Sequence, residues 1–83
     1  MDKIIKSTGE EKIITPKNNK HYTLDEMQSI VGGYIELLSI TATSYLVLNE
    51  DGRFQCPINY KASKLFNRDL YGDVLICKSK HIK

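Results

Sequence analysis

The sequence has no long hydrophobic run, and its net charge is small. No apolar segment approaches the roughly 20 residues that a membrane-spanning helix needs, so we expect no membrane partner. The first residues show neither the apolar core nor the cleavage site of a signal peptide, which favours a cytoplasmic protein. The net charge of +2 is too small to require a polyanion, which argues against nucleic acid as a partner.

The motifs that carry common catalytic and metal-binding chemistry are also missing. His21 and His81 lack zinc-ligand spacing, and there is no Cys-x-x-Cys, so we expect no metal site. The sequence contains no phosphate loop, no G-x-G-x-x-G and no G-x-S-x-G. Cys56 and Cys77 could pair, but two cysteines without a secretion signal favour reduced, buried thiols. We therefore predict a protein that is not an enzyme and binds no cofactor.

What the sequence does contain is a strong pattern over residues 22–40, YTLDEMQSIVGGYIELLSI. Thr23 and Glu26 stand three residues apart, which is the spacing of a helix-capping box. Gly32 is suited to the left-handed conformation that ends a helix. The apolar stripe expected on this helix consists of Leu24, Met27, Ile30 and Val31.

The strand predicted at Tyr34–Ile40 carries apolar side chains on both faces. Ile35 and Leu37 share one face because strand side chains alternate. Leu38 and Ile40 share the other. We expect such a strand either in the centre of a sheet or with one face covered by a partner chain. In so small a domain the pattern predicts a homo-oligomer, a two-fold dimer.

Shorter patterns complete the predicted order of elements. They are a hairpin over 3–6 and 12–15 around Gly9, a strand at 45–48 with a turn at 49–52 and a return at 53–56, a short helix capped by Asn59, an inner strand at 73–77 and a frayed basic tail at 78–83. The order is β-β-α-β-β-α-β. It predicts an α+β fold in a single domain over 1–83, with a mostly antiparallel sheet and two helices packed on one face.

The residues with the chemistry of a ligand site are scattered along the chain. The candidate ligand-binding residues are Gly33, Tyr34, Glu36, Asn59 and Lys61. We expect them to share one rim, where Gly33 lets the backbone approach the ligand. Tyr34 would stack on a nucleobase, Lys61 would face phosphate and Glu36 would accept hydroxyl protons. The alternatives are a half-buried strand tyrosine and a glutamate that is salt-bridged or exposed near a strand end. The basic loop 17–21 is either an anion site or, as we favour, simply solvated.

Four motifs resemble a family of small domains of unknown function that bacteriophages and related mobile elements encode. They are YTLDEMQSIVGGYIE, which contains the signature YTL-x-E-x-Q-x-IVGGYIE, then LNEDGRF, CPINYKAS and GDVLI, and together they span a family-like core at 22–77. The resemblance implies a phage-type α+β domain acting in the cytoplasm of a bacterial host cell. It implies no activity.

From that origin we hypothesise a phage accessory protein that counters host immunity. It would bind and sequester a nucleotide-derived signalling molecule. The alternative is a small protein–protein interaction module that inhibits a host defence protein by covering its surface.

Overall fold

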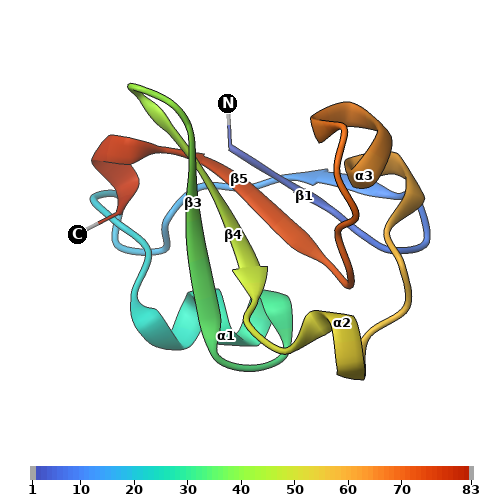
Figure 1. The fold of residues 1–83 in the computed structure, drawn as a ribbon. Coiled ribbons are helices and arrows are strands. Elements are labelled where there is room, and N and C mark those ends of the chain that lie inside the picture. Colours follow the sequence, from blue (N-terminus) through green and yellow to red (C-terminus); the bar gives the residue numbers. More distant parts are fainter. Residues whose placement is uncertain (1, 83) are drawn as a thin grey trace.

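The computed structural model describes residues 2–82, and its centre is one five-stranded antiparallel sheet (Figure 1). In chain order the elements are β1 (Lys3–Ile5), β2 (Glu11–Ile13), α1 (Leu24–Val31), β3 (Ile35–Thr41), β4 (Ser44–Asn49), α2 (Gly52–Gln55), α3 (Tyr60–Phe66), β5 (Val74–Lys78) and the 3₁₀ helix η1 (Ser79–His81). The strand order is β2-β1-β5-β4-β3, and every neighbouring pair is antiparallel. The predicted α+β class is confirmed.

The helices cover both faces of the sheet, whereas we expected both on one face. Met27 of α1 packs in one apolar cluster with Val47 and Leu75, which we call the α1-side cluster. Ala62 of α3 packs in a second cluster with Leu46, which we call the α3-side cluster. Because successive strand residues point to opposite faces, Leu46 and Val47 of the same strand serve different clusters. Figure 1 shows the result, with α1 below the sheet and α3 above it.

The start and end predicted for α1 are confirmed. The Glu26 N–H donates to Thr23 Oγ1 at 3.1 Å, and the Thr23 N–H donates to Glu26 Oε1 at 3.0 Å, which completes the capping box. Gly32 ends the helix with φ of +81°. Met27 is buried as predicted, but Leu24 is 55% exposed, so its place in the apolar stripe was predicted wrongly.

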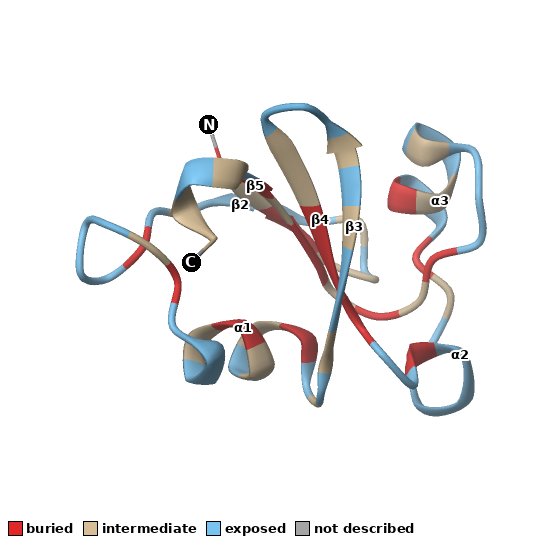
Figure 2. Cartoon of the chain, turned by 60° about the vertical axis from the view of Figure 1, so that its left-hand side comes forward, coloured by how far each residue is buried: buried red, intermediate tan, exposed pale blue. Residues whose placement is uncertain are grey.

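β3 lies at the edge of the sheet, so the expected central position is wrong. Its apolar residues on both faces have a different cause, because the sheet is covered from both sides. Ile35 packs on the α1-side cluster, whereas Leu38 and Ile40 pack on the α3-side cluster. Leu37 remains 40% exposed. In Figure 2, β3 is mostly exposed or intermediate beside the buried β4.

The segment predicted to return as a strand forms the short helix α2 instead. β4 already pairs with β3 and β5, so neither of its edges is free for a third strand. Asn49 Oδ1 accepts from the Asp51 N–H at 2.8 Å, which turns the chain into the helix. Gly52 has no positive φ; a side chain there would put Cβ 3.2 Å from the Tyr71 carbonyl oxygen.

The basic tail does not fray over the residues that the structure describes. After β5 the chain forms η1, and the Ser79 N–H donates to the Thr43 carbonyl at 2.7 Å. The His81 carbonyl accepts from the Tyr22 N–H at 2.8 Å. Ile82 is partly buried and packs against the α1-side cluster, so the segment after β5 is anchored to the core as far as Ile82. Lys83 lies outside the described residues.

Candidate functional site

Asn59, one of the predicted ligand-binding residues, is completely buried and has a structural role. Its Nδ2 donates to the carbonyls of Ile5 at 2.9 Å and Gly72 at 2.8 Å. Its Oδ1 accepts from the Ala62 N–H at 3.0 Å, which is the predicted helix cap. With these bonds made and no exposed surface, Asn59 has no polar atom available to a ligand.

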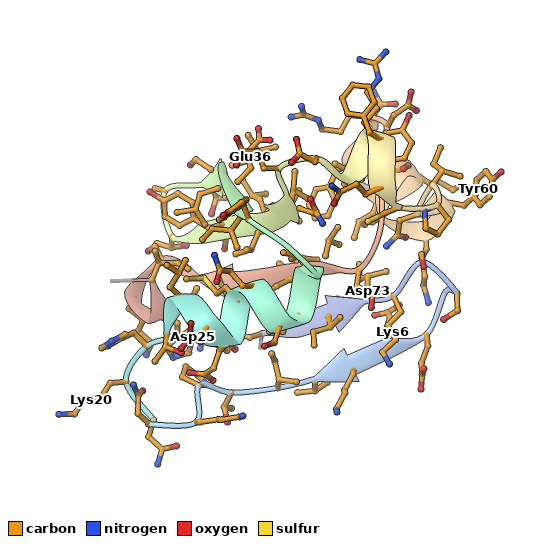
Figure 3. All side chains as sticks on the ribbon, turned by 90° about the horizontal axis from the view of Figure 1, so that it is seen from below. Lys6, Lys20, Asp25, Glu36, Tyr60 and Asp73 are labelled. Carbon is orange, nitrogen blue, oxygen red and sulfur yellow. The ribbon has the colours of Figure 1, made fainter. Side chains whose placement is uncertain are left out.

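Lys61 and Glu36 lie far from each other. Lys61 sits over the β1–β2 hairpin, where its Nζ pairs with Glu11 and donates to the Gly9 carbonyl at 3.2 Å. Hydrogen bonds from Lys3 and Lys61 lower the pKa of Glu11 to about 2. Glu36 is exposed on β3, at the other edge of the sheet, and Figure 3 shows it well away from Tyr60, the neighbour of Lys61 in α3. The predicted common rim does not exist.

Gly33 and Tyr34 do line one cavity, of about 290 Å³, together with Gln28, Asp51 and Gln55. Tyr34 is 71% exposed there. The close backbone approach expected at Gly33 is made by a protein side chain, since a Cβ at this position would lie 3.0 Å from Asn49 Nδ2. No basic residue lines this cavity, so it offers an aromatic face without a phosphate partner.

A larger cavity, of about 560 Å³, opens between α1 and the β1–β2 side of the sheet. It lies beyond the strands on which α1 mainly packs, which are β3, β4 and β5. We call this cavity the α1 groove. It is lined by Ile4, Lys12, Ile14, Thr15, Lys17, Asn18, Thr23, Asp25, Glu26, Ser29 and Ile30.

The α1 groove has an apolar floor with charged residues of both signs around it. Isoleucines from β1, the segment after β2 and α1 supply the floor, and all of them pack on the α1-side cluster. Lys12 of β2 and Lys17 of the loop before α1 line the groove, and neither lies within ion-pair distance of a carboxylate among residues 2–82, although the charge of Lys17 helps to lower the pKa of Glu26. Asp25 and Ser29 line the α1 side, and Figure 3 labels Asp25 on the helix. The groove therefore combines an apolar surface with two lysines, two carboxylates and hydroxyl groups.

Glu26 fixes the wall of the α1 groove where the loop meets the helix. Its Oε1 completes the capping box, and its Oε2 accepts from the Lys17 N–H at 3.2 Å. The hydrogen bond from the Thr23 backbone lowers the pKa of Glu26, and the one from Lys17 adds to the effect. Sequence patterns missed this groove; the only signal was the basic loop 17–21, which we interpreted as solvated.

A second polar cluster joins the two ends of the chain. Asp2 is 3% exposed; its Oδ2 accepts from the Tyr22 hydroxyl at 2.8 Å and contacts His81 Nδ1. Its Oδ1 accepts from the Lys78 N–H at 3.0 Å. Burial raises the pKa of Asp2, but hydrogen bonds from Tyr22, His81 and Lys78 outweigh burial and lower it. The cluster holds the first and last strands and the segment before α1 together.

Cys77 lies in the same cluster region and is buried. Burial, with a smaller contribution from Asp2, raises the pKa of its thiol to about 12. The thiol is therefore protonated at neutral pH and is a poor nucleophile. Within residues 2–82, no three metal-ligating side chains are gathered, and no helix has the length and apolar character to cross a membrane.

These features define a class of protein, a small α+β domain with an antiparallel sheet and an open groove beside its first helix. The chain belongs to the family described as Domain of unknown function (DUF3846), whose model matches residues 2–82. The predicted membership in a family of unknown function is thus confirmed, and the match extends beyond the predicted core at 22–77. No curated protein and no solved structure matches the chain.

Proposed function

We propose that the chain is a non-enzymatic binding protein that holds a nucleotide-derived small molecule in the α1 groove. The observation that supports this most is the groove itself, an apolar floor lined by Lys12 and Lys17, which make no ion pair within residues 2–82, and by the carboxylates of α1. Its volume of about 560 Å³ exceeds the 420 and 290 Å³ of two other cavities. Small-molecule sites commonly measure about 300–1,000 Å³.

The groove matches the parts of a nucleotide one by one. A base would pack on the floor formed by Ile4, Ile14 and Ile30, where burial of its faces is favourable. Lys12 and Lys17 would donate to phosphate oxygens through charge-assisted hydrogen bonds. Ribose hydroxyls would donate to a carboxylate on the α1 rim. The proposed ligand site therefore lies beside β1 and β2, and not at the start of β3 where the sequence patterns predicted it.

The resemblance to phage-encoded domains supplies the biological setting of the proposal. In a bacterial cytosol such a protein would lower the free concentration of a host nucleotide signal by binding it, with no chemical step. Cyclic nucleotides and ADP-ribose derivatives have the base, hydroxyls and phosphates that the α1 groove would recognise. Each groove would take one molecule, so inhibition would require protein in amounts comparable to those of the signal.

We expect calorimetry against a panel of cyclic and ADP-ribose-type nucleotides to detect binding that Lys12→Ala and Lys17→Ala each weaken at least tenfold. A hydrogen bond to a charged group contributes about 1.5–3 kcal/mol, which corresponds to about a tenfold or larger change in Kd. Both lysines are exposed, so the melting temperature should hardly change. Lys64→Ala, on the exposed side of α3, is the matched control and should bind like wild type. An absence of heat at high micromolar nucleotide contradicts the proposal.

A protein partner is the second candidate, supported by a pair of exposed aromatic residues at one corner of the molecule. Tyr34 is 71% and Phe54 83% exposed, and the Arg53 guanidinium lies 5.8 Å from the Phe54 ring centre. Exposed aromatics and arginine are the residues that contribute most at protein interfaces. If no nucleotide binds, this corner becomes the surface with which the chain would cover a host defence protein.

A further inference from the structure

The edge of the sheet formed by β3 has none of the usual protection against strand pairing. It is seven residues long, contains no proline or lysine and carries a single charge, Glu36. The opposite edge, β2, is only three residues long, and its Glu11 is paired with Lys3 and Lys61. Natural sheets shorten, charge or cover their edges because open ones pair with other strands. Of the two edge strands, β2 is protected in this way and β3 is not.

The backbone groups of β3 that point away from β4 can be assigned from one hydrogen bond. The Glu50 N–H donates to the Tyr34 carbonyl at 2.8 Å, one step before the register pair of Ile35 with Asn49, so the hydrogen-bonded pairs of the β3–β4 ladder fall at every second residue counted from Tyr34. In an antiparallel ladder such pairs alternate with pairs whose backbone groups point outward. The outward residues are therefore Ile35, Leu37 and Ser39.

We propose that β3 pairs antiparallel with β3 of a second copy about a two-fold axis through Leu37, which joins the two sheets into one. In this register Leu37 faces Leu37 of the second copy, and Ile35 faces Ser39. Three facing pairs exchange two hydrogen bonds each, about six in all. The exposed Leu37 side chains, each 40% accessible in the single chain, cover each other.

Neighbouring registers are worse for identifiable reasons. One step toward the start of β3 places Glu36 opposite Glu36 of the second copy, and like charges in direct opposition are unfavourable. One step toward the end reaches the irregularity between Ser39 and Thr41, where the Ser39 hydroxyl also donates to the Thr41 carbonyl at 3.1 Å. Only the register centred on Leu37 uses all three outward residues and separates the glutamates.

A second copy fits this edge better than a foreign strand because the edge is complementary to itself. Two-fold pairing of β3 with β3 closes the assembly at two molecules, since β2 at the other edge is short and charged. No residue of β3 lines the α1 groove, so each copy keeps its own open groove. The dimer therefore stands or fails independently of the proposed ligand.

Sedimentation velocity across a dilution series tests the dimer. We expect wild type to sediment as a dimer at high micromolar concentration and Leu37→Lys to sediment as a monomer, because two lysines would face each other on the axis. Ile13→Lys is the matched control, as Ile13 is 59% exposed on the other edge strand, and it should remain dimeric. Far-UV circular dichroism checks that each variant is folded. A monomeric wild type, or a dimer that survives Leu37→Lys, overturns the proposal.

Oxidative cross-linking tests the register. Leu37→Cys should form an intermolecular disulfide, because directly facing Cα atoms lie about 5.5 Å apart in a hydrogen-bonded pair. Ser39→Cys should not, since the two Ser39 positions are four residues apart along the paired strands. Wild type is the control, because it measures how much disulfide forms through Cys56, which is partly exposed. Equal cross-linking of the two variants contradicts the register centred on Leu37.

Discussion

Asn59→Ala is expected to lower the free energy of unfolding by about 3 kcal/mol or more. The substitution leaves two buried carbonyls, those of Ile5 and Gly72, without their donor. It also removes the cap from the Ala62 N–H. Each buried polar group left unpaired costs about 1–3 kcal/mol, so the three losses together reach this size.

Urea unfolding followed by circular dichroism measures the effect. Asn18→Ala is the matched control, because Asn18 is exposed and its Oδ1 accepts from the N–H groups of Lys20 and His21 in a surface loop. We expect the control to cost less than about 1 kcal/mol, since water replaces the lost acceptor. Equal losses for the two variants would show that Asn59 does not connect α3 to β1 as the structure indicates.

Asp2→Ala is the second large effect, with an expected loss of about 2–4 kcal/mol at neutral pH. The change leaves the buried Tyr22 hydroxyl and the Lys78 N–H without their acceptor. It also removes the carboxylate that contacts His81. The first strand, the last strand and the segment before α1 would then be joined by apolar packing and the remaining backbone bonds.

The lowered pKa of Asp2 also lets us predict how the free energy of unfolding changes in acid. Its pKa is lowered in the folded state, so its contribution to stability is complete above the unfolded value of about 3.9. The contribution is lost as pH falls through the lower folded pKa. We expect the difference in stability between wild type and Asp2→Ala to shrink below about pH 4. Asp69→Ala, at an exposed aspartate, is the matched control and should leave the free energy of unfolding at neutral pH nearly unchanged. A pH-independent difference between wild type and Asp2→Ala would contradict the assignment.

Features of the fold that depend on neighbours in sequence could be predicted. The capping box of Thr23 and Glu26 and the left-handed Gly32 need only residues a few positions apart. The positions of most strands follow from local alternation in the same way. The edge position of β3 could not be predicted, because apolar residues on both faces fit an inner strand as well as an edge strand between two helical layers.

The candidate site failed as a prediction because it depended on distant pairings. Asn59 was correctly predicted as a helix cap, but its second role requires β1, 54 residues away in the sequence. The contact between Asp2 and His81 spans 79 residues and has no local signature. The α1 groove likewise depends on how α1 packs on the sheet.

Isoleucine-methyl NMR during a nucleotide titration tests the proposed ligand site most directly. We predict shifts for the methyl groups of Ile4, Ile14 and Ile30, which form the floor of the α1 groove. The methyl groups of Ile5 and Ile76 pack in the cluster on the opposite face of the sheet and should not move. Shifts confined to that opposite face, or no shifts at saturating nucleotide, would contradict ligand binding in the α1 groove.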